Sequence, residues 1–171
     1  MEPTRRDPGR RRRRRASPNP RTCARWAEAA LAAVERPGAA ITVRIVAEQE
    51  GRALNRDFRG RDYATNVLSF AFPEVPPEAA AELGAPYIGD LAVCAPVVAR
   101  EAGEQGKTPR AHWAHMVVHG VLHLAGHDHH EAEQAARMEA LERRVLAGLG
   151  FPDPYGDADH RHEVSDGQPH G

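Results

Sequence analysis

The sequence of 171 residues has little cysteine, few aromatic residues and no long apolar run, and each shortage excludes a class of protein. The two cysteines, Cys23 and Cys94, are too few for a disulfide framework, and both lie in apolar segments. This pattern is typical of buried thiols in a reducing compartment. No stretch reaches the roughly 18 apolar residues that a membrane-spanning helix needs. We therefore expect a cytoplasmic protein without membrane contact.

The arginine-rich beginning of the chain does not continue into the apolar segment of a signal peptide, because residues 26–34 are mostly alanine and are interrupted by Glu28. Residues 1–25 contain ten arginines against Glu2 and Asp7, a local charge of +8. The remaining residues therefore carry −9, although the whole chain has a net charge of −1. Any surface of the folded part that binds nucleic acid must come from a local cluster of basic residues.

Three segments of the chain differ in composition. Residues 1–21 contain an unbroken run of arginines, Arg10 to Arg15, and such mutually repelling charges predict a disordered arm. One interpretation is that this arm contacts nucleic-acid phosphates. The alternatives are that it is a solvated extension, or that the start codon has been placed too far upstream. Residues 156–171 are polar and predict a flexible tail. Residues 22–155 remain as a single domain of ordinary size.

Hydrophobic periodicity divides this domain into helices and strands. Thr108 followed by Pro109 is a strong signal for the start of a helix, and Gly126 is suited to end it. The predicted helices are 22–35, 48–58, 95–105, 109–125 and 131–147, and the predicted strands are 41–45, 65–72 and 87–93. Strands interleaved with helices predict an α/β fold in which a small mixed β-sheet packs against helices.

Histidine is concentrated in the motif HxxxHxxGxxH, formed by His119, His123, Gly126 and His129. Residues four apart lie on one face of a helix, so His119 and His123 can bind one ion. Gly126 can adopt the left-handed conformation that ends a helix, which would return His129 to the same ion. Three imidazoles suit one zinc ion per chain, or nickel as a close alternative. They leave a fourth coordination position for water, as catalytic zinc sites do.

Other residues near the motif are less informative. His115 lies one turn before His119 and is either an orienting residue or a structural one. His112 lies further along the same face, and we expect it to be exposed to solvent. Asp128 is a candidate for orienting one of the imidazoles, and Asp90 is a weaker candidate for the same site.

The spacing of the histidine motif equals that of the metzincin proteases, HExxHxxGxxH, with one difference. Gly120 stands where those enzymes have the glutamate that takes a proton from water at the metal. A metalloprotease is therefore an alternative that lacks its general base.

Arg52, Arg56 and Arg59 lie at i, i+4 and i+7 and share one helix face, and Arg61 follows in the adjoining loop. Guanidinium groups bind phosphate oxygens in pairs, so this cluster suits a nucleic-acid backbone. The alternative is a solvated helix face with pairs along the helix, such as Glu48 with Arg52. Beside a metal site that lacks the peptidase base, the cluster favours phosphodiester chemistry.

Several separated motifs in residues 22–155 together resemble the YbeY endoribonucleases, also called rRNA maturation factors. The motifs that carry the resemblance are Leu54-Asn55, Arg59-Gly60-Arg61-Asp62, Thr65 to Phe70, Gly89-Asp90-Leu91, His112 to His115, the histidine motif and Asp153-Pro154-Tyr155. Two features depart from the family pattern: His127 stands where tyrosine is common, and the arginine-rich arm has no counterpart.

The resemblance implies an α/β fold, one metal ion assigned as zinc, and hydrolysis of single-stranded RNA. It also implies roles in maturing the 3′ end of small-subunit rRNA and in ribosome quality control, with pre-rRNA and the small ribosomal subunit as partners. By the same resemblance, His119, His123 and His129 are the metal ligands. Arg59 is the functionally important arginine, and we expect it to stabilise charge on the phosphoryl oxygens.

Three other functions remain as alternatives to the nuclease. One is a non-catalytic ribosome assembly factor that uses zinc to brace its fold, and a second is the metalloprotease. The third, a simple RNA-binding module, is disfavoured by the acidic body and by the few aromatic residues available to stack on bases.

Overall fold

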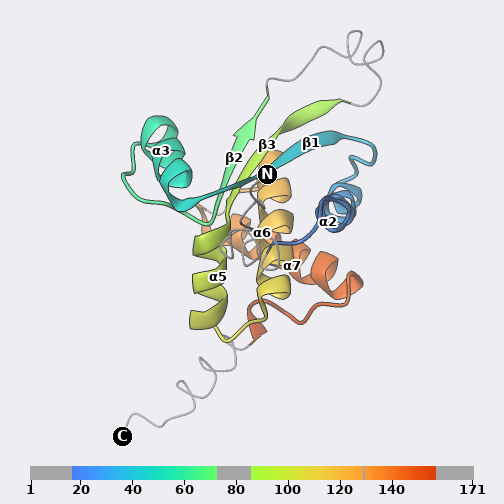
Figure 1. Ribbon diagram of the computed structural model, residues 1–171. Coiled ribbons are helices and arrows are strands. Elements are labelled where there is room, and N and C mark those ends of the chain that lie inside the picture. The colour runs from blue at the N-terminus through green and yellow to red at the C-terminus, as the bar shows by residue number, and fades with distance from the viewer. Residues whose placement is uncertain (1–16, 73–85, 129, 157–171) are drawn as a thin grey trace, which may run out of the picture.

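The computed structural model describes residues 17–72, 86–128 and 130–156. Most of the predicted arm (1–21), nearly all of the predicted tail (156–171) and His129 lie outside the described residues. The helices and strands follow one another in the order α2 (Pro20–Ala33), β1 (Ala40–Val46), α3 (Glu48–Arg59), β2 (Val67–Ala71), β3 (Tyr87–Cys94), α5 (Ala95–Glu104), α6 (Pro109–Leu124) and α7 (Ala132–Gly148) (Figure 1).

The three strands form one mixed sheet in the order β1-β3-β2. β1 runs parallel to β3, whereas β2 pairs with β3 in the antiparallel direction. The predicted α/β fold with a small mixed sheet is confirmed. In this order β2 is an edge strand, so one of its sides is not covered by another described strand.

The helix boundaries follow local capping signals. The Thr108 side chain accepts a hydrogen bond from the backbone N–H of Ala111 at 3.1 Å, as predicted for the start of α6. Gly126, with φ of +98°, follows the end of that helix. α2 begins two residues before its predicted start, because the side chain of Asn19 accepts from the N–H of Thr22 at 2.9 Å and so caps the helix earlier.

β2 begins two residues after the start of the predicted strand 65–72. The side chain of Asn66 forms hydrogen bonds directly before the first residue of the strand. Its Oδ1 accepts from the N–H of Val67 at 2.7 Å, and its Nδ2 donates to Glu101 of α5 at 3.0 Å. Glu101 also lies 3.0 Å from Nε2 of His112 on α6. The expectation that His112 is exposed was wrong, because this residue is buried, and the burial lowers its pKa.

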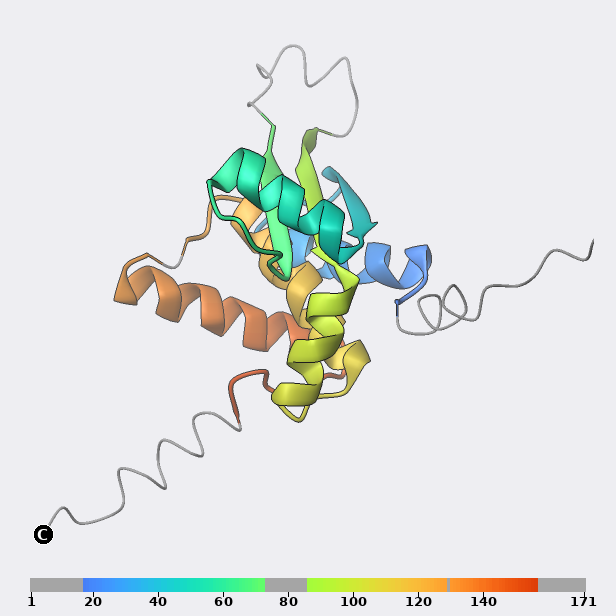
Figure 2. The same ribbon diagram turned by 60° about the vertical axis from the view of Figure 1, so that its left-hand side comes forward.

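α6 is the central helix of the molecule. It packs against β2 and β3 on one side and is surrounded by α2, α5 and α7 on the others (Figures 1 and 2). The larger core lies between this helix group and the sheet and contains Trp113, Val117 and Val121 of α6 with Leu91 and Val93 of β3. The position of α6 means that only a short stretch of it can present side chains to solvent.

The other face of the sheet is partly covered by α3 (Figure 2). Because side chains alternate along a strand, Ala92 and Cys94 point to this face while Leu91 and Val93 point to α6. Cys94 and Cys23 are both buried thiols, as predicted, and burial raises the pKa of each. None of the described helices is both long enough and apolar enough to cross a membrane.

Candidate metal centre

His119 and His123 interrupt the otherwise buried middle of α6. Both are half-buried, and the side chain of His119 is 26% exposed. Their rings lie with centroids 6.3 Å apart and an angle of 21° between their planes. Two nearly parallel imidazoles one turn apart therefore point to the same side of the helix.

Each of these two rings is oriented by a hydrogen bond at Nδ1. Nδ1 of His119 lies 2.7 Å from Oε1 of Glu142, and Nδ1 of His123 lies 2.8 Å from the backbone carbonyl oxygen of His127. A carbonyl and an ionised carboxylate can only accept, so both Nδ1 atoms carry the proton. In the neutral form of each ring the lone pair is then on Nε2, which is the atom through which these rings can bind a metal ion.

The carbonyl of His127 reaches His123 because the chain reverses directly after α6. Gly126 has a positive φ, and the N–H of His127 donates to the carbonyl of Leu122 at 3.0 Å. This hydrogen bond closes the C-terminal end of the helix, and the glycine has the left-handed conformation that is usual at such an end. His129, which the sequence predicts as the third ligand, follows this turn but lies outside the described residues. Its role stays a prediction.

Glu142 of α7 is the centre of a buried polar network beneath the two rings. It is 0% exposed. Its Oε1 accepts from His119, while its Oε2 lies 2.7 Å from Nε2 of His115 and accepts from the hydroxyl of Tyr155 at 2.5 Å. A buried carboxylate with both oxygens hydrogen-bonded is satisfied, and it fixes the orientation of each donor.

The ionisation of Glu142 follows from two opposing effects. Burial alone would raise the pKa of this carboxyl group, but the hydrogen bonds from His115 and His119 outweigh it and bring the pKa to about 2. Glu142 is therefore a carboxylate near neutral pH, and it acts on both histidines only as an acceptor. The pKa of Tyr155 is raised by its burial and by its hydrogen bond to this carboxylate, so its hydroxyl keeps its proton.

A second grouping could also hold a metal ion. Possible ligand atoms of His115, His119 and Glu142 lie within 4.8 Å of one another. Each of the two imidazoles, however, lies only 2.7 Å from a Glu142 oxygen. Two ligands of a tetrahedral zinc ion, each about 2.0–2.1 Å from it, are roughly 3.3 Å apart. The observed distances are those of direct hydrogen bonds, so Glu142 in this arrangement orients His119.

Arg59, the predicted catalytic arginine, lies at the end of α3 beside β2. Its guanidinium donates to the backbone carbonyl of Ser69 at 2.5 Å and lies 5.3 Å from the ring centroid of Phe70. The hydroxyl of Ser69 in turn donates to the carbonyl of Gly120 at 3.2 Å, next to His119. A single residue of β2 therefore links the arginine to the histidine helix.

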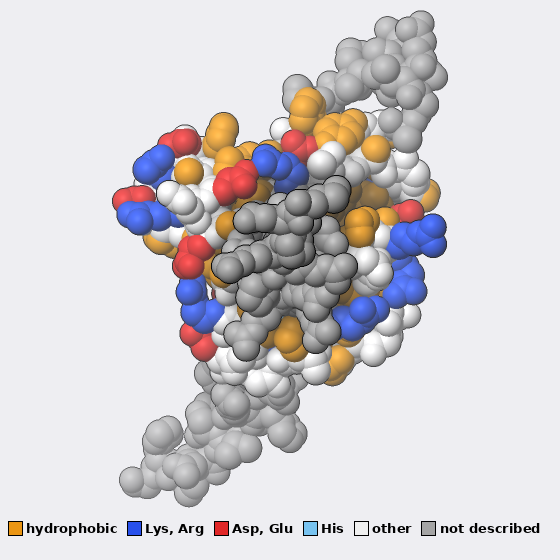
Figure 3. Space-filling model, in the orientation of Figure 1, with side chains coloured by type: hydrophobic (Ala, Val, Ile, Leu, Met, Phe, Trp, Pro, Cys, Tyr) orange, Lys and Arg blue, Asp and Glu red, His pale blue; other side chains and the backbone are white. Residues whose placement is uncertain are grey.

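Two other arginines of the predicted basic cluster, Arg52 and Arg56, have acidic partners, whereas Arg61 donates to the hydroxyl of Tyr63 at 3.1 Å. Arg52 forms two hydrogen bonds to Asp62, at 2.8 and 3.0 Å, and Arg56 contacts Asp57 at 3.2 Å. Figure 3 shows basic and acidic side chains interspersed on the surface around α3. The uniformly positive helix face that the sequence predicts is therefore largely neutralised. Arg59 differs from Arg52 and Arg56, because the contacts described for it are with neutral groups.

The sequence matches the family model described as Endoribonuclease YbeY over residues 12–150. The chain belongs to the YbeY endoribonuclease family. It is 63% identical to the Endoribonuclease YbeY of Alkalilimnicola ehrlichii, with 77% of this chain and 78% of that protein covered. It is also 63% identical to that of Halorhodospira halophila (76% and 82% covered) and 55% identical to that of Stutzerimonas stutzeri (83% and 86% covered). The solution structure of TM1509 from Thermotoga maritima aligns with a TM-score of 0.48 at 25% identity, covering 91% of this chain and 94% of that one.

The packing around position 120 bears on why this YbeY chain has glycine rather than glutamate in its histidine motif. A Cβ atom at Gly120 would lie 2.8 Å from Cδ2 of Leu91 and 3.2 Å from Cγ2 of Val67. Residue 120 therefore faces the sheet, and a glutamate side chain there would have to displace the side chains of Leu91 and Val67. The packing of the YbeY helix on its sheet therefore disfavours a glutamate, the metzincin general base, at this position.

Two residues of this YbeY centre, Glu142 and Tyr155, were missed as functional residues in the sequence. The signal for Glu142 is an acidic residue on the apolar face of the predicted last helix, four residues after Met138 and three before Val145. Tyr155 is part of a motif that resembles YbeY, but no property of the sequence joins it to Glu142. Only the packing of the chain end against α7 brings the two together.

The sequence suggested two further carboxylates near the YbeY centre, Asp128 and Asp90, and the role of Asp128 in orienting an imidazole stays a prediction. The rings of His119 and His123 are held by Glu142 and a backbone carbonyl, whereas Oδ1 of Asp128 lies 3.4 Å from Nε2 of His130. Asp90 lies in a cavity on the face of the sheet that α3 covers.

Proposed function

We propose that this chain is a zinc-dependent endoribonuclease that cleaves single-stranded RNA. Its role would be maturation of the 3′ end of small-subunit rRNA and ribosome quality control. Membership in a family of endoribonucleases supports the cleavage of RNA. The observation that supports the metal dependence is the pair His119 and His123, whose Nδ1 atoms both donate to acceptors, so that Nε2 is the metal-binding atom of each ring in its neutral form.

In this proposal His119, His123 and His129 hold one zinc ion, which when bound supplies Lewis-acid activation of water for phosphodiester hydrolysis. The chain's own contribution is to orient the ligands. Glu142 and the carbonyl of His127 fix the two imidazole planes, so that little reorganisation is needed when the metal binds.

Arg59 would bind the phosphate of the RNA. Its guanidinium lies on the solvent-exposed end of α3, one β2 residue away from the histidine helix, and its described contacts leave its charge uncompensated by any carboxylate. A positive charge fixed near the scissile phosphate stabilises the negative charge that develops during cleavage.

The proposed function also sets the partners and location of the chain. Pre-rRNA and the small ribosomal subunit would be its partners, and the cytoplasm its location. Residues 22–155 would form a single metallohydrolase domain, flanked by the arginine-rich arm of residues 1–21 and the polar tail of residues 156–171. An arm that contacts phosphates would add affinity that falls as salt rises.

A cleavage assay on the purified full chain tests the function. We expect a pre-rRNA fragment with a single-stranded 3′ extension to be cut, and a fully paired duplex of the same sequence to remain intact. A chelator should abolish the cleavage, and zinc should restore it. RNA binding without any chelator-sensitive cleavage would instead support the zinc-braced assembly factor, and digestion of casein would support a protease.

Replacing Arg59 with alanine should lower kcat/KM for RNA by about 10²–10³, the loss that follows removal of one stabilising donor from a transition state. Arg59→Lys should recover only part of the activity, because an ammonium group lacks the paired donors of guanidinium. Arg52→Ala is the matched control, since Arg52 lies on the same helix but is bonded to Asp62. Equal losses in Arg52→Ala and Arg59→Ala would contradict a specific role for Arg59.

A further inference from the structure

The face of the sheet that α3 partly covers carries a group of aromatic side chains, which we call the aromatic strip. It consists of Phe58 from α3, Phe70 from β2, Phe72 directly after β2, and Tyr87 from β3. Phe58 packs edge-on against Phe70 with ring centroids 5.3 Å apart, and Phe72 packs edge-on against Tyr87 at 5.0 Å. Phe58 and Phe72 are 62% and 53% exposed. Three of the four phenylalanines of the chain are therefore on one face, although aromatic residues are few overall.

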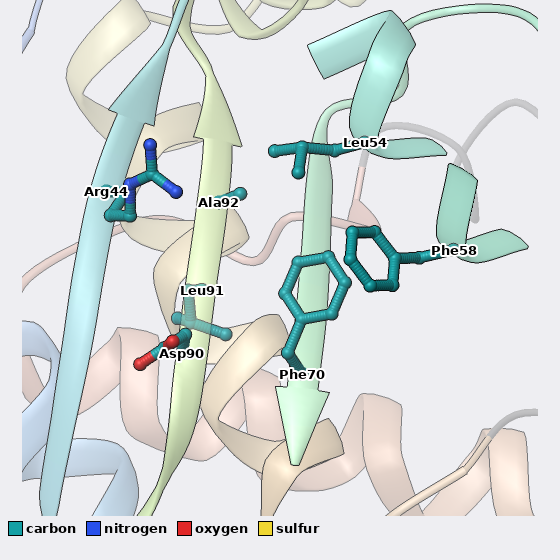
Figure 4. A pocket seen from close by; sticks show the side chains of 7 residues that line it. All are labelled: Arg44, Leu54, Phe58, Phe70, Asp90, Leu91 and Ala92. Carbon is teal, nitrogen blue, oxygen red and sulfur yellow. The ribbon is translucent and has the colours of Figure 1, made fainter. Parts of the chain in front are cut away.

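A cavity of about 270 Å³ lies between the Phe58–Phe70 pair and the strands. It is lined by side chains from α3 and from all three strands, as Figure 4 shows: Arg44, Leu54, Phe58, Phe70, Asp90, Leu91 and Ala92. Its volume lies just below the range of roughly 300–1,000 Å³ that is usual for pockets that bind drug-sized molecules. A planar group of one or two rings matches this size.

The walls of the cavity differ in chemistry. Phe58 and Phe70 form an aromatic wall, whereas Arg44 and Asp90 lie on the opposite side, on β1 and β3 (Figure 4). Arg44 donates to Glu50 at 2.6 Å, and Asp90 accepts from the hydroxyl of Tyr87, so both charged groups are held in place. A guanidinium and a carboxylate supply a donor and an acceptor, which are the groups that recognise the edge of an unpaired nucleobase while its face stacks on an aromatic ring.

The cavity is connected to the candidate metal centre through β2. Phe70 lies beneath the guanidinium of Arg59, and Ser69, the preceding residue, bonds to both Arg59 and the Gly120 carbonyl. Because β2 is an edge strand, an RNA strand can pass over this edge from the α6 face to the α3 face. Its phosphate would meet Arg59 at the crossing point, and a neighbouring base would then reach the cavity.

We propose that this cavity binds one unpaired nucleobase of the RNA strand, a short distance along the chain from the phosphate that is cleaved. This inference rests on the proposed function, because it assigns a part of the same substrate to a second site. An extended protein segment suits the cavity less well, because the cavity is small and Arg44 and Asp90 are among its lining residues. The base site would explain a requirement for single-stranded RNA, since a base in a duplex cannot enter the cavity.

The test measures the binding of a short single-stranded RNA of mixed sequence to the full chain. The RNA carries a fluorescent label, and binding is measured by fluorescence anisotropy. A chelator is present so that the RNA is not cleaved during the measurement. Phe58→Ala should raise Kd by about fivefold or more, the effect of losing one stacked base. The same variant should bind a strand with abasic positions as the unchanged protein does. Phe58→Trp should keep the affinity for intact RNA, because it keeps an aromatic face.

Ile45→Ala is the control for removal of an exposed apolar side chain, since Ile45 is 47% exposed on β1 but points away from the cavity. Circular dichroism would establish that the variants are folded. The base site is overturned if Phe58→Ala binds intact RNA as tightly as the unchanged protein, or if its binding to intact and abasic strands falls equally. A protein partner that binds the unchanged chain but not Phe58→Ala, with RNA affinity unaffected, would assign the cavity to that partner instead.

These outcomes are separate from a failure of the proposed function. The anisotropy measurement needs neither metal nor cleavage, so a chain that binds RNA through Phe58 but never cuts it would support the base site and contradict the nuclease. A chain that cuts RNA, and whose affinity for RNA is unchanged by Phe58→Ala, would support the nuclease and contradict the base site. If the unchanged chain does not bind single-stranded RNA at all, both proposals are wrong.

Discussion

Replacing His123 with alanine should remove bound metal and RNA cleavage together. Nε2 of His123 is one of the three proposed ligand atoms, and two imidazoles hold zinc much less tightly than three. We expect cleavage to fall by more than about a hundredfold, which is the upper end of the effect of residues that only orient a ligand. The measurement is elemental analysis of the purified chain beside a cleavage assay on the same preparation, with and without chelator.

The control for His123→Ala is His130→Ala, because the side chain of His130 is 79% exposed and belongs to the same histidine-rich segment. Its loss should leave both metal content and cleavage unchanged. The fold of the His123→Ala variant should persist, since His123 is only half-buried while the core of α6 is formed by residues such as Val117 and Val121. Undiminished cleavage by a His123→Ala preparation that contains no metal would contradict the proposed centre.

Replacing Glu142 with alanine should destabilise the fold as well as the metal centre. This change leaves the ring donors of His115 and His119 and the hydroxyl of Tyr155 without their shared acceptor. Removing one partner of a buried charged network costs about 3–5 kcal/mol in the free energy of unfolding. Zinc affinity should fall by about 10–100-fold, because the ring of His119 is no longer oriented. Urea denaturation and competition with a coloured chelator would measure the two effects.

The contribution of Glu142 to stability should depend on pH. Its pKa in the folded chain is about 2, below the ordinary value of 4.5, so folding favours the carboxylate form. The stabilisation is complete above about pH 4.5 and is lost as pH falls towards 2, with a size of the order of 3 kcal/mol. Glu142→Gln should lack this part of the acid dependence, so its free energy of unfolding should approach that of the unchanged chain as pH falls. Parallel curves for the two proteins would contradict the assignment.

The same two positions distinguish between the possible metal sites. If the ion were held by His115, His119 and Glu142, then Glu142→Gln would abolish metal binding and His123→Ala would leave it unchanged. The hydrogen-bonded geometry predicts the opposite order, with a complete loss in His123→Ala and a partial loss in Glu142→Gln. Metal content measured for both variants under the same conditions separates the two arrangements.

Much of the fold follows from signals that are local in the sequence. The capping side chain of Thr108, the proline after it and the glycine at 126 set the limits of α6, and both ends were predicted. The spacing of His119 and His123 determines that they share a helix face, because four residues make about one turn. Alternation along Ile41, Val43 and Ile45 similarly predicts β1. Each of these depends on residues a few positions apart.

Contacts between distant residues explain where the predictions fell short. Arg52 and Arg56 fall on one face of α3, but the sequence did not show that Arg52 pairs with Asp62 across a turn. His112 was expected in solvent, whereas packing of α5 on α6 buries it beside Glu101. The aromatic residues are too few to suggest base stacking, yet the antiparallel pairing of β2 with β3 places Phe72 against Tyr87 on one face.

The amino-acid sequence by itself determined the helices and strands, the shared face of His119 and His123, and the absence of a glutamate at position 120. Only the tertiary structure decided that Glu142 orients His119, that Gly120 is pressed against the sheet, and that a cavity opens on the sheet's other face. The physical reason is the range of the forces involved. Caps and periodicity act within a turn or two of one element, whereas a buried carboxylate acquires its partners only when α6, α7 and the chain end pack together.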